Sequence, residues 1–169
     1  MDHSLGRRPD PPHIEPQEVP LDPINRAEAI AHRAHAGQTD KSGLDYIDHP
    51  RRVAERAALI APADLRTECI AAAWLHDVVE DTDVTLEDLR EQGFPQLVLE
   101  AVDRLTKMPD VARTDYFAAI RAHAVARVVK TADLIDNTDP KRAALLDGTT
   151  RSRLADKYAE SWALLLGDD

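Results

Sequence analysis

The sequence has almost no cysteine and few aromatic residues. A single cysteine, Cys69, among 169 residues excludes an intramolecular disulfide and a zinc site built from several cysteines. Aromatic residues make up 4% of the chain although 43% of it is hydrophobic, much of that alanine. Small side chains let helices pack closely, whereas a β-sandwich needs β-branched and aromatic residues. The composition therefore favours an all-α protein.

Long apolar segments are missing as well, and no run approaches the roughly 20 residues of a membrane-spanning helix. The first residues contain no apolar stretch of the kind found in secretory signals, so we expect a cytoplasmic protein with no membrane partner. Positive charge is also scarce, because the formal net charge is −10. Nonspecific nucleic-acid binding needs many cations to neutralise phosphates, and nucleic acid is therefore not an expected partner.

Prolines are concentrated at the beginning of the chain, where residues 1–23 contain six of the eleven. This segment has no apolar periodicity, and we expect it to be extended or disordered ahead of a single domain over residues 24–169. Within that domain, turn and cap residues separate stretches of helical periodicity, and no stretch predicts a strand. We predict an all-α bundle of about seven to eight helices, over residues 22–36, 50–60, 65–80, 85–93, 95–105, 115–122, 124–136 and 150–166, with a short helix after 139–140.

The predicted helix over residues 65–80 is apolar on all sides and should lie at the centre of the bundle. Near its end, His76, Asp77, Glu80 and Asp81 project within an arc of roughly 140°. Three carboxylates and an imidazole at a buried helix end repel one another and lose hydration unless a cation binds between them. For Glu80 and Asp81 the alternative is that the helix ends at Val79 and both side chains face solvent.

The predicted helix over residues 124–136 combines apolar residues with charge in the same way. Asp133 and Asn137 are four residues apart and therefore share a face. Asp133 could equally form a salt bridge with Lys130, and Asn137 could be a C-cap. His49, just before the helix over 50–60, could likewise be a capping or packing group.

The order of His49, the pair His76-Asp77, and Asp133 resembles that of the HD-domain metal-dependent phosphohydrolases. Longer segments are similar to the (p)ppGpp hydrolase domain of the Rel/Spo stringent-response enzymes and of their small stand-alone Mesh1-type relatives. These segments are residues 34–38, 41–43, 46–47, 49–50, 53–54, 71–82, 105–107 and 129–137. The resemblance covers about residues 24–166 in order and implies a single HD-domain helical bundle.

The resemblance implies a metal centre. It makes His49, His76, Asp77 and Asp133 the ligands of one divalent ion, which in this family is usually manganese. Mixed imidazole and carboxylate ligands are compatible with Mn²⁺ and also with iron, cobalt or zinc.

The resemblance also implies roles in catalysis and substrate binding. Glu80 and Asp81 match the pair that positions and activates the attacking water. Lys41 and Ser42 match residues that line the nucleotide pocket, and Asn137 matches a residue near the ribose.

The sequence departs from the family pattern where the base is recognised. Asp40 replaces the arginine that stacks on guanine, Leu134 replaces a basic residue, and Asp136 stands where the family has an aromatic residue or histidine. A guanidinium attracts a purine face through cation–π contact, whereas the Asp40 carboxylate would repel phosphate. We therefore expect (p)ppGpp hydrolysis to be slow or to have a high KM, and Asp40→Arg to improve it.

The leading hypothesis is metal-dependent hydrolysis of a nucleotide phosphoester or pyrophosphate ester, with (p)ppGpp cleaved at its 3′ position as the first substrate candidate. A hydrolase of another nucleotide, such as a dinucleotide phosphate, is the alternative within the enzyme class. A catalytically silent nucleotide-binding regulatory module is the alternative outside it, although such a module would have little use for Glu80 and Asp81. A structural helical protein with coincidental charges would not need all four ligands together.

Overall fold

The computed structural model describes residues 22–167, which contain ten α-helices, one 3₁₀ turn and no strand beyond an isolated bridge between Thr39 and Asp45. Most of the proline-rich segment predicted to be disordered lies outside the described residues. The helices are α1 (Pro23–Ala34), α2 (Asp48–Ile60), α3 (Arg66–Leu75), α4 (Val78–Asp81), α5 (Leu86–Glu91), α6 (Gln96–Leu105), α7 (Arg113–Arg121), α8 (Ala124–Asn137), α9 (Pro140–Ala143) and α10 (Gly148–Leu166), with the 3₁₀ turn η1 at Ala63–Leu65.

The all-α prediction is confirmed, but one predicted helix is divided. The segment over 65–80 was expected to be continuous, whereas α3 ends at Leu75 and α4 begins at Val78. His76 and Asp77 form the turn between them, and the φ and ψ angles of Asp77 are −105° and −5°, away from those of a regular helix. The arc calculated for a continuous helix is therefore wrong. Three other helices begin two residues earlier than predicted: α2 at Asp48, α7 at Arg113 and α10 at Gly148.

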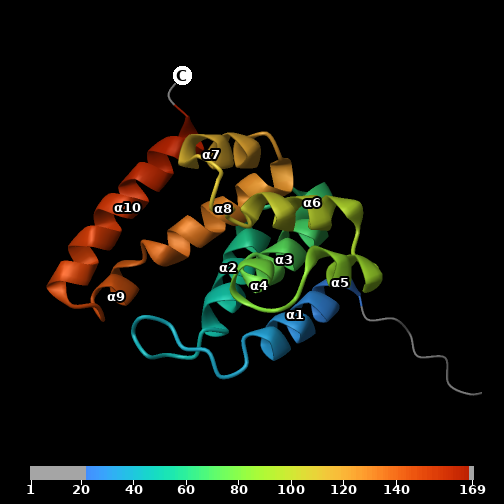
Figure 1. Cartoon of the computed structure of the whole chain (residues 1–169), viewed down its shortest axis with the longest axis horizontal. Helices are drawn as coiled ribbons and strands as arrows, with labels where there is room; N and C mark the ends of the chain where they lie inside the picture. Colours follow the sequence, from blue (N-terminus) through green and yellow to red (C-terminus); the bar gives the residue numbers. More distant parts are fainter. Residues whose placement is uncertain (1–21, 168–169) are drawn as a thin grey trace, which may run out of the picture.

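Helix α3 lies at the centre of the bundle and packs against α1, α2, α6 and α8 (Figure 1). Its residues 71–75, three of them alanine, are all buried. These small side chains allow four helices to approach α3 closely. As a result, the α3–α4 turn is held inside the bundle beside α2 and α8.

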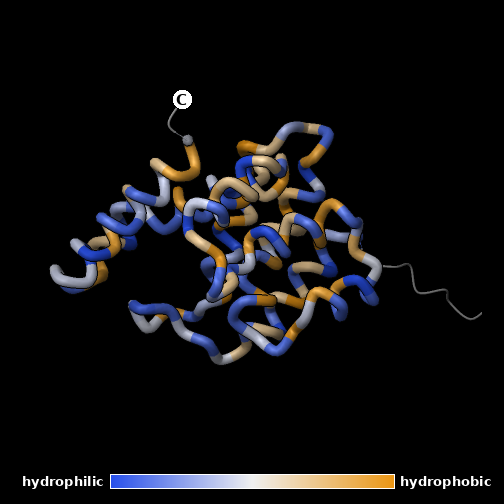
Figure 2. Tube along the Cα trace, turned by 45° about the horizontal axis from the view of Figure 1, so that its top comes forward, coloured by the Kyte–Doolittle hydropathy of each residue, from blue (hydrophilic) through white to orange (hydrophobic). Residues whose placement is uncertain are grey.

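Helices α9 and α10 lie to one side of this bundle, across from the loop that joins α1 to α2 (Figure 1). Helix α10 packs against α7 and α8. Hydrophobic and hydrophilic residues are interspersed along the helices (Figure 2), and among the described residues no helix is both long and apolar enough to cross a membrane.

Candidate metal centre

The four side chains predicted to bind a metal converge from three parts of the fold. His49 comes from the first turn of α2, His76 and Asp77 from the α3–α4 turn, and Asp133 from α8. The Nε2 atom of His49 lies 3.3 Å from Asp133 Oδ1 and 3.6 Å from Asp77 Oδ2. The Nε2 atom of His76 lies 3.0 Å from Asp77 Oδ2. Ligand atoms of His49, His76 and Asp133 are all within 4.8 Å of one another, and the three residues are buried. This is a candidate site for one cation.

The orientation of both imidazoles fits a metal ion. His76 donates its Nδ1 proton to the carbonyl oxygen of Ala73 at 2.7 Å, so Nε2 is the ring nitrogen that faces the other candidate ligands. That Nε2 is buried and makes no hydrogen bond within the described structure, because its 3.0 Å approach to Asp77 lacks hydrogen-bond geometry. Nδ1 of His49 contacts Asp136 at 2.8 Å, which turns its Nε2 toward the same point. Metal-binding histidines are usually held by such contacts at the other ring nitrogen.

Asp133 forms the salt bridge with Lys130 that its sequence position allowed, and its other carboxylate oxygen faces the histidines. Its Oδ2 accepts a hydrogen bond from Lys130 Nζ at 2.7 Å, while its Oδ1 faces His49. Burial alone would raise the pKa of Asp133, but the charge of Lys130 and the hydrogen bond to His49 outweigh it and hold that pKa well below its usual range. Asn137 donates to Asp133 Oδ1, and the C-cap of α8 is Thr138. The Lys130 salt bridge therefore does not exclude a ligand role.

Tyr46 also belongs to this centre, although the sequence analysis assigned it no role. Its hydroxyl donates to Asp77 Oδ2 at 2.5 Å and lies 3.4 Å from Asp81 Oδ2. Burial, together with the negative charge of Asp77, raises the pKa of Tyr46 far above its usual value, so the hydroxyl keeps its proton. The ring thus orients Asp77 from the loop before α2.

A cleft with a volume of about 770 Å³ opens beside these ligands. Its walls come from the α1–α2 loop, α4, the segment 105–117, α8, α9 and α10. All nine residues predicted to form the site line it, namely Lys41, Ser42, His49, His76, Asp77, Glu80, Asp81, Asp133 and Asn137.

Glu80 and Asp81 reach this cleft from α4. The Glu80 carboxylate accepts hydrogen bonds from Lys107, at 3.0 Å from Nζ and at 3.1 Å from the backbone N–H. Burial and the negative charges of Asp77 and Glu80 raise the pKa of Asp81. The alternative that both side chains simply face bulk solvent therefore does not describe Glu80, which is ordered by Lys107 at the cleft wall.

Asp40 makes contacts that its family position did not indicate. Its Oδ1 accepts hydrogen bonds from the backbone N–H groups of Ser42 at 2.8 Å and Leu44 at 3.1 Å. Its Oδ2 lies 3.4 Å from Nη2 of Arg142, a residue of α9 that also lines the cleft. Asp40 is thus a turn-forming and charge-paired carboxylate at the cleft wall, which favours a structural role over the repulsion of phosphate expected from the sequence.

The described residues form an all-helical bundle in which two histidines and two aspartates cluster at one cleft. The HD domain family model matches residues 27–116, more than half of the chain, and the protein belongs to the HD domain family.

Curated relatives match part of this chain. A guanosine-3′,5′-bis(diphosphate) 3′-pyrophosphohydrolase from Vibrio cholerae is 43% identical over 94 residues, which are 56% of this chain and 12% of the relative. The bifunctional (p)ppGpp synthase/hydrolase SpoT from Escherichia coli is 43% identical over 93 residues, 53% of this chain and 13% of SpoT. A GTP pyrophosphokinase from Streptomyces coelicolor is 39% identical over 106 residues, 63% of this chain and 12% of the relative. The matched regions are thus small parts of much longer proteins.

A solved structure of a metazoan SpoT ortholog, described as hydrolysing ppGpp, has a similar fold. Its TM-score is 0.58 at 21% sequence identity, and the match covers 88% of this chain and all of that chain. The similarity extends the shared fold beyond the residues matched by the family model.

Proposed function

We propose that this protein is a metal-dependent phosphohydrolase of nucleotides, with (p)ppGpp as the first substrate candidate and pyrophosphate, released from the 3′ position, as the product. The observation that carries the proposal is the convergence of the Nε2 atoms of His49 and His76 with two carboxylates, beside a cleft that also contains Glu80 and Asp81. The activities for which the relatives are named support the choice of substrate. The proposal assigns the activity to one domain over residues 24–169 and to the cytoplasm.

His49, His76, Asp77 and Asp133 would hold one divalent cation, for which we propose Mn²⁺. When bound, such an ion supplies Lewis-acid polarisation and charge neutralisation for a phosphoryl group. Tyr46 would keep Asp77 in place through its hydroxyl proton.

Glu80 and Asp81 would act on the attacking water. The carboxylate of Glu80 is fixed by two donors of Lys107, so it can accept a hydrogen bond from water in one orientation. A carboxyl group with a raised pKa, as in Asp81, is suited to receive and return a proton. Together they would orient the water and remove its proton.

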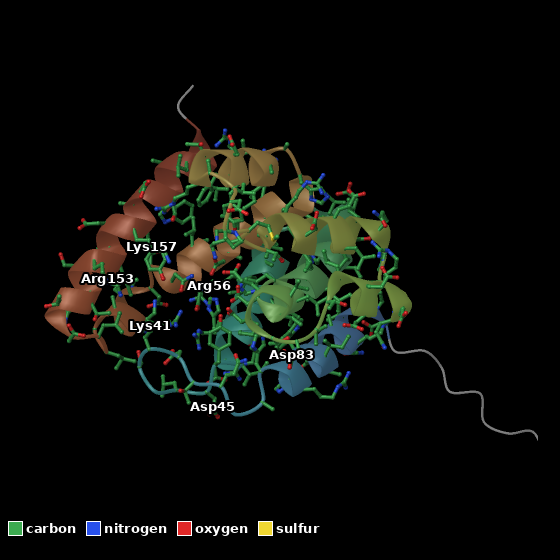
Figure 3. All side chains as sticks on the ribbon, viewed as in Figure 1. Lys41, Asp45, Arg56, Asp83, Arg153 and Lys157 are labelled. Atoms are coloured by element: carbon green, nitrogen blue, oxygen red, sulfur yellow. The ribbon has the colours of Figure 1, made fainter. Side chains whose placement is uncertain are left out.

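Positive charge in the cleft supports an anionic substrate. Figure 3 shows Lys41 on the α1–α2 loop and Lys157 on α10 at the same side of the molecule. Burial and the charges of neighbouring cations, with Lys107 and Lys41 the largest of these, lower the pKa of Lys157, which indicates a concentration of positive charge in a chain of net charge −10. Six cationic side chains line the cleft: Lys41, Lys107, Arg113, Lys130, Arg142 and Lys157.

The proposal is tested by incubating the purified protein with Mn²⁺ and separate nucleotides, including ppGpp, GTP and a dinucleotide polyphosphate. We expect release of pyrophosphate from ppGpp, and none after treatment with EDTA. Turnover of another nucleotide alone would support the alternative hydrolase. Binding of ppGpp without turnover of any nucleotide would support the regulatory module and contradict an enzyme.

Asp40→Arg is expected to lower kcat/KM for ppGpp by about tenfold rather than to raise it. The substitution removes two backbone hydrogen bonds, each worth about 0.5–1.5 kcal/mol, and places a guanidinium beside Arg142. Asp45→Arg is the matched control, because it adds the same charge to an exposed position of the same loop (Figure 3). The measurement is kcat/KM for ppGpp in the wild type and both variants, at fixed Mn²⁺ concentration and ionic strength. A gain in kcat/KM confined to Asp40→Arg would show that position 40 does recognise the base.

A further inference from the structure

Asp136 of α8 lies directly behind the candidate ligand His49. Its side chain is fully buried, and its Oδ2 is 2.8 Å from His49 Nδ1. Three guanidinium groups surround the same carboxylate. Arg52 donates from Nε to Oδ1 at 2.8 Å and from Nη2 to Oδ2 at 3.2 Å, Arg56 Nη1 lies 2.7 Å from Oδ1, and Arg142 Nη1 donates to Oδ2.

The Nδ1 atoms of the two histidines therefore contact hydrogen-bond acceptors of different charge. His76 is held by a neutral backbone carbonyl, whereas His49 is held by a carboxylate that three arginines keep in place. An anionic acceptor at Nδ1 fixes the imidazole tautomer, orients the ring and makes Nε2 a stronger electron donor.

We infer that Asp136 is a positioning residue for metal binding, which fixes His49 with Nε2 toward the cation, and that Arg52, Arg56 and Arg142 hold Asp136 in that position. The inference rests on the proposed metal centre. The competing explanation is that Asp136 only joins α2, α8 and α9 through salt bridges. The positioning role and the salt-bridge role predict different metal affinities for a variant of Asp136 that still folds.

The test compares Asp136→Asn with Asp139→Asn. Asp139 also pairs with Arg56, at 3.1 Å, but does not contact His49, and asparagine can replace it as the N-cap of α9. Titration of each metal-free variant with Mn²⁺ should give an affinity that is about 10- to 100-fold weaker for Asp136→Asn and unchanged for Asp139→Asn. With Co²⁺ as the probe, Asp136→Asn alone should shift the visible absorption bands of the bound ion.

Equal Mn²⁺ affinity and identical Co²⁺ spectra for Asp136→Asn and the wild type would overturn the inference and leave the proposed function standing. A wild type that binds neither ion would overturn both. If Asp136→Asn does not fold, ¹⁵N NMR of the Zn²⁺-loaded wild type tests the inference instead, because it reports the tautomer of His49. We expect a hydrogen-bonded proton on His49 Nδ1 and none on Nε2, and the opposite tautomer would refute the inference.

Discussion

Asp77→Ala is expected to abolish binding of the divalent cation. Asp77 Oδ2 lies 3.0 Å from His76 Nε2 and 3.6 Å from His49 Nε2 and accepts the Tyr46 hydroxyl proton. Burial alone would raise the pKa of Asp77, but the charges of His76 and His49 outweigh it and lower that pKa. Alanine removes both a proposed ligand and the negative charge nearest to His76 Nε2. Breaking a buried charged pair costs about 3–5 kcal/mol, so the metal-free variant should also be less stable.

Metal content and thermal unfolding with and without Mn²⁺ measure the two effects separately. Ligand at 100 times its Kd stabilises a folded protein by about 2.7 kcal/mol, so Mn²⁺ should raise the Tm of the wild type and leave that of Asp77→Ala unchanged. Asp83→Ala, which removes an exposed carboxylate near α4 (Figure 3), should behave like the wild type. About one ion per chain in Asp77→Ala would refute its assignment as a ligand.

The sequence predicted which side chains converge at the cleft better than it predicted which residues hold them in place. His76 and Asp77 follow a run of apolar residues, and that local pattern correctly indicates a charged group inside the bundle. The partners of His49 and Tyr46 could not be predicted in this way, because they lie far away in the sequence. His49 contacts Asp136, 87 residues later, and Tyr46 contacts Asp77, 31 residues later. Spacing along one helix carries no information about such contacts, which depend on how helices pack.

Asp40 shows how one residue type can support two interpretations. Taken as a substitution at a family position, it indicated a charge that repels the substrate. Taken locally, Asp40 followed by Gly43 is a turn signal, because an aspartate side chain accepts hydrogen bonds from backbone N–H groups two or more residues later. Gly43 has a positive φ of 78°, as such a turn allows. The local signal was present in the sequence, but the pairing with Arg142 was not, since it joins residues 102 positions apart.

Glu80→Gln is expected to keep the metal ion and to lose most of the turnover. Glu80 is not among the side chains that approach the two histidines, and it lines the cleft one turn beyond them. Glutamine keeps an oxygen that can accept the backbone N–H of Lys107, so α4 should remain in place. It cannot take a proton from water, and loss of a general base lowers kcat by about 10²- to 10⁴-fold.

The measurement pairs kcat with metal content for the wild type, Glu80→Gln and Asp83→Asn. Asp83→Asn is the control for removing one negative charge close to α4, and it should retain both activity and metal. Because the lost proton transfer affects the chemical step, Glu80→Gln should lower kcat far more than it raises KM. A loss confined to KM would instead assign Glu80 to substrate binding through Lys107. Near-normal kcat would exclude it as the residue that activates water and leave Asp81, with its raised pKa, to perform that step alone.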